Sequence, residues 1–263
     1  MNGILDFHNH VIPGVDDGAQ NPEESIAALR ALASHGVTHV ITTPHFDGSL
    51  TLRPAAAADR LKELDEGWAR LQAVAGAVPE ITVHRGAEVM LDTPTPDLSD
   101  PRLHLAGGRF VLVEFPFMTI PPESPRVVTY LRNAGLIPII AHPERYNGVV
   151  VGSNLPLEWR AAGALLQVNG GSLLGRYGKG PKSNAEDLLG RGIVDFVSSD
   201  YHTRGSPQIR QYCAWLEERG GREQAQLLTT VNPMRMLNGE MPLPVVPLRA
   251  AGSGWSRLLP WKR

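Results

Sequence analysis

Two histidines, His8 and His10, stand at the end of a short apolar run and just before a loop rich in glycine and aspartate. Residues two apart on an extended strand point to the same face, so the two imidazoles can bind one metal ion. A His-x-His pair alone is weak evidence, because strand histidines are often only surface residues. The pair therefore predicts a metal site only if further ligands follow along the chain.

Such ligands do follow, and each lies at or shortly after the end of a predicted strand. Active sites of α/β barrels lie at the carboxyl ends of their strands, so these side chains should converge on one mouth. Five of the nine histidines of the chain fall at such positions. We interpret the other four, which are His35, His39, His84 and His104, as helix-end, surface or packing residues. The predicted ligands are His8, His10, Asp17, His45, Glu88, Glu114, His142, Asp200 and His202.

The chemistry of this ligand set points to catalysis. It contains only imidazoles and carboxylates, which suits Mn, Fe or Zn and disfavours a structural zinc site. Nine donors exceed the needs of one ion, and a carboxylate such as Glu88 can bridge two. Glu88 and Glu114 could instead be surface carboxylates, but Glu114 lies in the apolar segment Phe110–Phe117, where an unpaired charge would be costly. A cluster of two or three ions can bind both a hydroxide and a phosphoryl group, so we expect phosphate-ester hydrolysis.

The elements that must position these ligands alternate along the chain. The first predicted helix has Asn21 as its N-cap and Pro22 at its first position, and it ends at Gly36. Further helical segments are expected over residues 61–71, 127–131, 157–164 and 185–191. Strands alternating with helices predict an α/β fold with a parallel, barrel-like sheet. The predicted strands are Ile4–His8, His39–Thr43, Ile81–Val83, Phe110–Glu114, Ile137–Ala141, Leu165–Val168 and Asp195–Ser199.

The Pro-rich segment 241–247 marks the expected end of the folded domain. We therefore divide the chain into a domain over residues 1–240 and a tail over residues 241–263. The last part, residues 250–263, mixes Trp255 and Trp261 with basic side chains. Such a composition suits a membrane surface or an acidic partner, but it also suits a plain tail or a packing strap. The role of the tail stays open.

Composition excludes several classes of protein. The 263 residues carry a formal net charge of −2, which argues against binding to nucleic acid or anionic lipid. A single cysteine excludes an intramolecular disulfide framework, and the N-terminus lacks the pattern of a signal peptide. No apolar run approaches the length that spans a membrane. We expect a cytoplasmic enzyme.

Two other motifs could be mistaken for phosphate chemistry. Cys213 and Arg219 have the Cys-x5-Arg spacing of cysteine-dependent tyrosine phosphatases, but the intervening residues lack glycine and form a helical pattern. On a helix, residues six apart point to different faces, so this reading is disfavoured. The glycine-rich stretch 170–180 resembles a phosphate loop but contains no GxxxxGK[ST] match. We predict a flexible loop at the rim of the site instead.

From about Leu5 to Asn238 the chain resembles a known superfamily. The segments "DFHNHVIPGVDDG", "ITTPHF", "GAEVML", "VLVEFPF", "IAHPERY", "VNGGSLLGRYGKGPK" and "VSSDYH" are similar to the polymerase-and-histidinol-phosphatase (PHP) superfamily. Within it, they resemble the metal-dependent bacterial tyrosine phosphatases of capsule and exopolysaccharide gene clusters. The resemblance implies a distorted (β/α)7 TIM-like barrel, the PHP fold, with three metal ions that are usually manganese; Fe and Zn stay open. It also implies that the substrate is the phosphotyrosine-bearing tail of a cognate bacterial tyrosine autokinase.

The resemblance also implies roles for single residues. Arg145 matches a family arginine that contacts phosphate, and a second such arginine follows the last metal-binding histidine. Arg204 is our choice for this second position, with Arg210 as the alternative. The register favours Asp17 over Asp16 as a metal ligand. The implied ligand sets are His8, His10, Glu88 and Asp200 for one ion; Glu88, Glu114 and His142 for the second; and Asp17, His45 and His202 for the third.

Three classes of function are therefore considered. A protein-tyrosine phosphatase is the leading one. A small-molecule phosphoesterase such as a histidinol-phosphate phosphatase would share the same metals and barrel. A non-catalytic metal-binding regulator is disfavoured, because no ligand position is lost. We expect no nucleic-acid partner and only indirect membrane contact, and we leave homo-oligomerisation open.

Overall fold

The computed structural model describes residues 3–248, and within them all paired strands run parallel. One sheet has the order β1-β2-β4, and the other has the order β3-β5-β6-β7-β8-β9. The strands are β1 (Ile4–Asp6), β2 (Val37–Thr42), β3 (His45–Asp47), β4 (Thr82–Arg85), β5 (Glu88–Met90), β6 (Phe110–Glu114), β7 (Ile137–Ala141), β8 (Leu165–Asn169) and β9 (Phe196–Ser198).

The two sheets follow one another around a barrel. Short breaks separate β2 from β3 and β4 from β5, so that four strand segments occupy two positions of the barrel. Beyond β9, the backbone N–H of Asp200 donates to the carbonyl of His8 at 2.8 Å, and the N–H of His10 donates to the carbonyl of Tyr201 at 2.9 Å. These bonds join the ends of the first and last strands. The predicted α/β fold, a distorted (β/α)7 barrel, is confirmed.

The breaks were not predicted from the sequence. His45 and Glu88 were expected in loops after their strands, but they are the first residues of β3 and β5, paired with each other in register. Pro44 lies in the first break and has no N–H to donate to a ladder. Gly86 lies in the second, where an added Cβ would come within 3.1 Å of Leu105 and Ile41 side chains. Each break therefore has an identifiable cause. It places a predicted ligand just beyond the carboxyl end of β2 or β4, as the first residue of β3 or β5.

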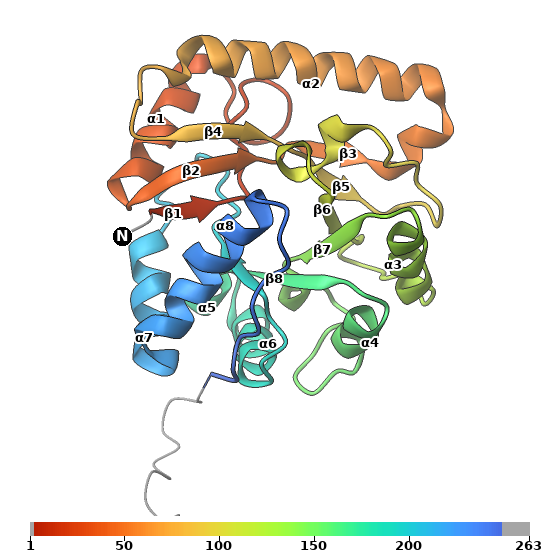
Figure 1. Ribbon diagram of the computed structural model, residues 1–263, viewed down its shortest axis with the longest axis vertical. Helices are drawn as coiled ribbons and strands as arrows, with labels where there is room; N and C mark the ends of the chain where they lie inside the picture. Colours follow the sequence, from red (N-terminus) through yellow and green to blue (C-terminus); the bar gives the residue numbers. More distant parts are fainter. Residues whose placement is uncertain (1–2, 249–263) are drawn as a thin grey trace, which may run out of the picture.

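Helices cover the outside of the sheet (Figure 1). The long helix α2 lies along the top of the molecule in this view, above β4 and β2. Helix α1 begins as predicted, because the Asn21 side chain accepts a hydrogen bond from the N–H of Glu24 and Pro22 occupies the first turn. The helices are α1 (Pro22–Ser34), α2 (Pro54–Ala75), α3 (Ser124–Asn133), α4 (Leu155–Ala161), α5 (Gly170–Leu173), α6 (Lys179–Gly190), α7 (Ile209–Gln226) and α8 (Asn232–Leu237).

The core has two clusters. The larger one packs strand residues such as Val111 and Val113 against the surrounding helices. The smaller one contains Phe110 and Leu112, the alternate residues of the same strand, together with side chains from other strands. Alternate residues of a strand face opposite sides, so the smaller cluster fills the inside of the barrel. Glu114 continues this inward-facing series, which places its carboxylate at the carboxyl end of the barrel interior.

The expectation of a flexible rim loop over residues 170–180 is corrected by the structure. Gly170 and Gly171 begin helix α5, and Lys179 and Gly180 begin helix α6, so that only residues 174–178 connect the two helices. An added Cβ at Gly170 would lie 2.0 Å from the ring of Tyr212. The glycine at this position therefore permits close packing of α5 against α7.

The end of the described chain runs along the barrel. Residues 241–248 contain no helix or strand, but Val245 and Leu248 are buried, and the N–H of Leu248 donates to the carbonyl of Leu189. The domain boundary at residue 240 stays a prediction. The aromatic and basic tail over residues 250–263 lies outside the described residues. Between residues 3 and 248, no helix combines the length and apolarity needed to cross a membrane.

Candidate metal centre

All nine predicted ligands lie in one continuous cluster at the carboxyl ends of the strands. The cluster consists of four overlapping groups, and within each group the ligand atoms lie within 4.8 Å of one another. No further residue in the described part of the chain belongs to such a group. The groups are His10, Asp17, His45 and His202; His8, His10 and Glu88; His8, His142 and Asp200; and His45, Glu88 and Glu114.

These groups agree with the implied ligand sets only in part. The set of Asp17, His45 and His202 is found together, with His10 added. The first implied set is divided between two groups, and His45 instead of His142 joins Glu88 and Glu114. The nine residues are thus brought together, while the ion that each one binds stays a prediction.

The two histidines that follow β1, His8 and His10, are held in one orientation by polar partners. Nδ1 of His8 lies 2.9 Å from Oε1 of Gln167, and Nδ1 of His10 lies 2.8 Å from Oδ2 of Asp16. Both partners are hydrogen-bond acceptors, so each Nδ1 carries a proton and Nε2 is the nitrogen that faces the centre. Metal-binding imidazoles have this arrangement. Sequence reasoning missed Gln167, although its place on β8 beside the predicted ligands was a possible signal.

Unpartnered buried atoms at the centre fit a bound cation. Nε2 of His8, Nε2 of His10 and Oε2 of Glu88 are all buried. Oε2 lies 3.2 Å and 3.5 Å from the two nitrogens, but none of the three atoms makes a hydrogen bond. Buried polar atoms are nearly always satisfied, so these three point to a ligand that belongs among them. The donor set of imidazoles and carboxylates suits Mn, Fe or Zn.

The buried charges at the centre also favour binding of a cation. Glu88 is the central carboxylate, with Oε2 3.2 Å from Nε2 of His8 and Oε1 2.9 Å from Nε2 of His142. Burial opposes charge on His8, but the carboxylates of Glu88 and Asp200 outweigh it and raise the pKa of His8 to about 10. Burial likewise acts against charge on His45, yet Glu114 and Glu88 raise its pKa to about 11. The buried carboxylates thus attract positive charge, which protons or metal ions can provide.

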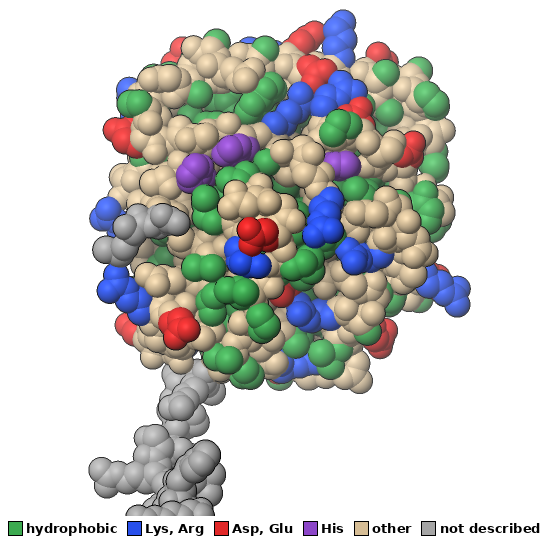
Figure 2. All heavy atoms as spheres, in the orientation of Figure 1, with side chains coloured by type: hydrophobic (Ala, Val, Ile, Leu, Met, Phe, Trp, Pro, Cys, Tyr) green, Lys and Arg blue, Asp and Glu red, His purple; other side chains and the backbone are tan. Residues whose placement is uncertain are grey.

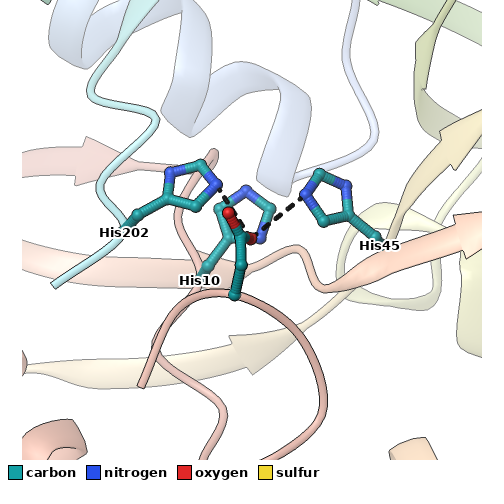
Figure 3. Close-up of side chains that lie close together, drawn as sticks. His10, His45 and His202 are labelled. Atoms are coloured by element: carbon teal, nitrogen blue, oxygen red, sulfur yellow. Dashed lines mark ion pairs between the residues drawn. The ribbon is translucent and has the colours of Figure 1, made fainter. Parts of the chain in front are cut away.

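Asp16 and Asp17 have different roles. Oδ1 of Asp17 lies 3.5 Å from Nε2 of His45 and 3.3 Å from Nε2 of His202. Figure 3 shows His10, His45 and His202 turned toward one another, with these two ion pairs drawn as dashed lines. Asp16 instead binds Nδ1 of His10 and accepts from the N–H of Gly18 at 3.0 Å. The geometry therefore favours Asp17 as the metal ligand and Asp16 as the residue that orients His10.

Two of the ligands have strained backbones. His142 has a φ of +34°, and Asp200 has a φ of +52°. Non-glycine residues in this left-handed region cost about 1–3 kcal/mol each, and such strain is concentrated at functional sites. The surrounding structure thus holds both side chains toward the centre at the expense of stability.

Arg145 lies against the centre between two aromatic rings. Its Nη1 is 2.7 Å from Oδ2 of Asp200, and its guanidinium carbon lies 4.7 Å from the centroid of Phe117 and 4.3 Å from that of Tyr177. The rings fix the plane of the guanidinium, since a cation is attracted to the face of each aromatic ring. Sequence reasoning identified Arg145 but missed both rings, because three separate loops bring them together.

The two candidates for the second arginine differ in position. Nη2 of Arg204 donates to the backbone carbonyl of Asp17 at 3.1 Å. The backbone N–H of Arg210 instead donates to Nδ1 of His35, at the end of helix α1. Arg204 therefore lies beside the centre, although its phosphate contact stays a prediction.

The alternative cysteine chemistry has no support. Cys213 and Arg219 both lie within helix α7, as predicted, and burial raises the pKa of the Cys213 thiol to about 11. A thiol with so high a pKa is protonated near neutral pH and is a poor nucleophile. Cys213 lines a cavity of about 700 Å³ that also includes Ile4, at the start of β1 and thus at the opposite end of the strands from the ligands.

Comparison with protein families and with known proteins identifies relatives of the chain. The model of a family described as "Capsular polysaccharide synthesis, CpsB/CapC" matches residues 4–238. The chain is 31% identical over 200 residues to the tyrosine-protein phosphatase YwqE of Bacillus subtilis strain 168, covering 76% of this chain and 77% of that protein. It is 24% identical over 248 residues to the tyrosine-protein phosphatase CpsB of Streptococcus pneumoniae, covering 90% of this chain and 100% of that protein.

Solved structures of similar proteins are also found. A structure from work on YwqE of Bacillus subtilis and CpsB of Streptococcus pneumoniae, described as unique metal-dependent tyrosine phosphatases, matches with a TM-score of 0.76 and 28% identity. The match covers 93% of this chain and 98% of that chain. The phosphotriesterase homology protein from Escherichia coli matches with a TM-score of 0.55 at 15% identity, covering 90% of this chain and 99% of that one, which shows a common fold.

Proposed function

The chain belongs to the CpsB/CapC family of capsular polysaccharide synthesis, and from this premise we propose that it is a metal-dependent protein-tyrosine phosphatase. The observation that carries the proposal is the convergence of nine imidazole and carboxylate ligands at one end of the barrel. Relatives named as tyrosine-protein phosphatases support it. The reaction is hydrolysis of a phosphate monoester.

We propose that the nine residues hold a cluster of three manganese ions. When bound, such ions activate water as a nucleophile and neutralise charge on the phosphoryl group. Gln167 and Asp16 keep Nε2 of His8 and His10 directed at the cluster. Arg145 and Arg204 bind the phosphoryl oxygens, since a planar guanidinium matches a pair of such oxygens.

The exposure of the centre favours a protein substrate over a metabolite. The side chains of His45 and Asp17 are 38% and 56% exposed, whereas those of His8 and Glu88 are almost fully buried. A site that opens at the surface on one side can accept a tyrosine that projects from a polypeptide. We propose that the substrate is the phosphotyrosine-bearing tail of a bacterial tyrosine kinase that controls capsule or exopolysaccharide synthesis in the cytoplasm.

One face of the molecule carries side chains of both charges. On the face drawn in Figure 2, basic and acidic side chains are interspersed with hydrophobic ones. This face thus carries no stripe of the kind that binds a nucleic-acid backbone. The net charge of −2 agrees with this conclusion.

Metal removal and substrate choice test the proposal together. Chelation should abolish activity toward a phosphotyrosine peptide, and a series of Mn, Fe and Zn salts should show restoration that is greatest with Mn. The kcat/KM for the peptide should exceed that for histidinol phosphate. A protein that stays inactive with every metal would overturn the proposal, and higher kcat/KM for histidinol phosphate would establish the small-molecule alternative.

Substitution of Arg145 by lysine should lower kcat/KM for phosphotyrosine peptides by roughly tenfold or more. A lysine keeps the charge but cannot reproduce the bidentate fork or the stacking between Phe117 and Tyr177. Steady-state kinetics on one peptide gives the measurement. Arg109→Lys is the matched control, because Arg109 precedes β6 at the other end of the barrel. An Arg145→Lys enzyme with unchanged kcat/KM would remove Arg145 from the phosphate site.

A further inference from the structure

A second basic site lies beside the metal centre, in a hollow of about 360 Å³ between the loop after α5 and the loop after His202. The residues that line it are Leu174, Gly175, Arg176, Arg204, Gly205, Ser206 and Gln208. Two of these are arginines, and none is acidic. Within the described chain, neither arginine forms an ion pair with a carboxylate. The hollow therefore has uncompensated positive charge at an accessible position.

The two arginines are tied to backbone carbonyls in a series that leads to the centre. Nη2 of Arg176 donates to the carbonyl of Arg204 at 3.4 Å, and Nη2 of Arg204 donates to the carbonyl of Asp17 at 3.1 Å. A guanidinium has five N–H donors, so each of these groups keeps free donors for a ligand. The bonds thus position the arginines without neutralising them.

The hollow is close enough to the phosphate site to be used by the same substrate. The guanidinium carbons of Arg145 and Arg176 lie 4.3 Å and 5.9 Å from the centroid of the Tyr177 ring. The ring of Tyr177 thus lies close to both guanidinium groups. An extended polypeptide advances about 3.3–3.6 Å per residue, so a group one to three residues from the phosphotyrosine can reach the hollow.

We propose that Arg176 provides an anion subsite, which binds an acidic group of the substrate near the phosphotyrosine, while Arg204 lies between this subsite and the metal centre. This inference rests on the proposed phosphatase function and adds a substrate preference to it. The group that this subsite binds is an anion, either a carboxylate or a second phosphate. Both accept hydrogen bonds from a guanidinium fork. A flanking glutamate and a flanking phosphorylated residue are the two sources to distinguish.

The test compares four peptides that share one phosphotyrosine and differ at the neighbouring positions. The first has neutral flanking residues, the second has glutamates, the third has the matching glutamines, and the fourth has a phosphoserine. The manganese-loaded protein should show kcat/KM about three- to tenfold higher for the glutamate or phosphoserine peptide than for its neutral counterpart. The preference should decrease as ionic strength rises, because both arginines are exposed.

Arg176→Gln should remove most of this preference, and Arg176→Lys should retain part of it. Arg109→Gln, which removes the same charge at the far end of the barrel, should keep the full preference. Equal kcat/KM for all four peptides, or a preference that survives in Arg176→Gln, would overturn the subsite. Whichever acidic peptide is preferred identifies the source of the anion.

A binding measurement separates failure of the subsite from failure of the proposed function. Fluorescence anisotropy gives the Kd of the same four labelled peptides for the manganese-loaded protein without requiring turnover. Tighter binding of the acidic peptides to wild type than to Arg176→Gln supports the subsite even if no peptide is hydrolysed. In that case the absence of hydrolysis counts against the phosphatase function alone, whereas equal Kd values count against the subsite alone.

Discussion

Replacement of Asp200 by alanine should lower kcat on phosphotyrosine peptides by at least about 10³-fold, because one side chain supports two parts of the site. Its Oδ1 lies 3.3 Å from Nε2 of His8 and 3.5 Å from Nε2 of His10. Its Oδ2 accepts hydrogen bonds from Arg145 and from the amide of Asn169. Alanine would remove a ligand from the centre and leave the Arg145 guanidinium without its anchor.

The measurement combines kcat, metal content by elemental analysis, and circular dichroism to confirm the fold. Metal content should fall together with kcat. Asp187→Ala is the matched control, since this carboxylate pairs with Arg191 on α6 and lies outside the groups of ligand atoms. A variant at Asp200 that has lost all metal but keeps a near-normal kcat would disprove metal-dependent hydrolysis.

Gly18→Ala should be the second severe change, although glycine contributes no functional group. A Cβ at this position would lie 1.9 Å from the carbonyl oxygen of His10 and 2.5 Å from the Cβ of His10. Backbone atoms cannot rotate away as a flexible side chain can, so the loop that carries Asp16 and Asp17 must shift. We expect a loss of about 1–3 kcal/mol in the free energy of unfolding and a loss of roughly 100-fold in kcat.

Denaturant unfolding and steady-state kinetics on the same preparation check both effects. Gly76→Ala provides the comparison, because nothing lies within 4 Å of its added Cβ and its φ of −60° suits any residue. That substitution should be neutral or stabilise by about 0.4–1 kcal/mol, since alanine restricts the unfolded chain. Equal stability and activity in Gly18→Ala would show that the loop tolerates displacement and that the position of His10 is not critical.

The sequence alone was sufficient for the fold class and for naming the nine side chains that the structure brings together, while their binding of metal stays a prediction. Both depend on local signals, namely the alternation of apolar strands with helices and the polar residues at strand ends. The first helix shows how far such signals reach, since the Asn21 cap and the Gly36 end were both predicted and both are present.

The features that sequence reasoning missed depend on contacts between distant segments. Gln167, on β8, is recognisable as a partner of His8 only in the folded barrel, where its Oε1 lies 2.9 Å from Nδ1 of His8. The rings of Phe117 and Tyr177 come from separate loops that meet at Arg145. The break before β5 likewise depends on the packing of Leu105 and Ile41 around Gly86. None of these contacts has a pattern within a window of neighbouring residues.

Closure of the barrel between β1 and β9 has a consequence for biosynthesis. The N–H of Ser199 donates to Oδ1 of Asp6, a contact between residues 193 positions apart. The ligands His8 and Asp200 are separated along the chain almost as widely, and contacts of such long range form late and slowly during folding. A nascent chain that has not yet released residue 202 from the ribosome holds most of the histidines but no complete cluster. The groups of ligand atoms that include Asp200 or His202 are therefore completed only when the first and last strands have met.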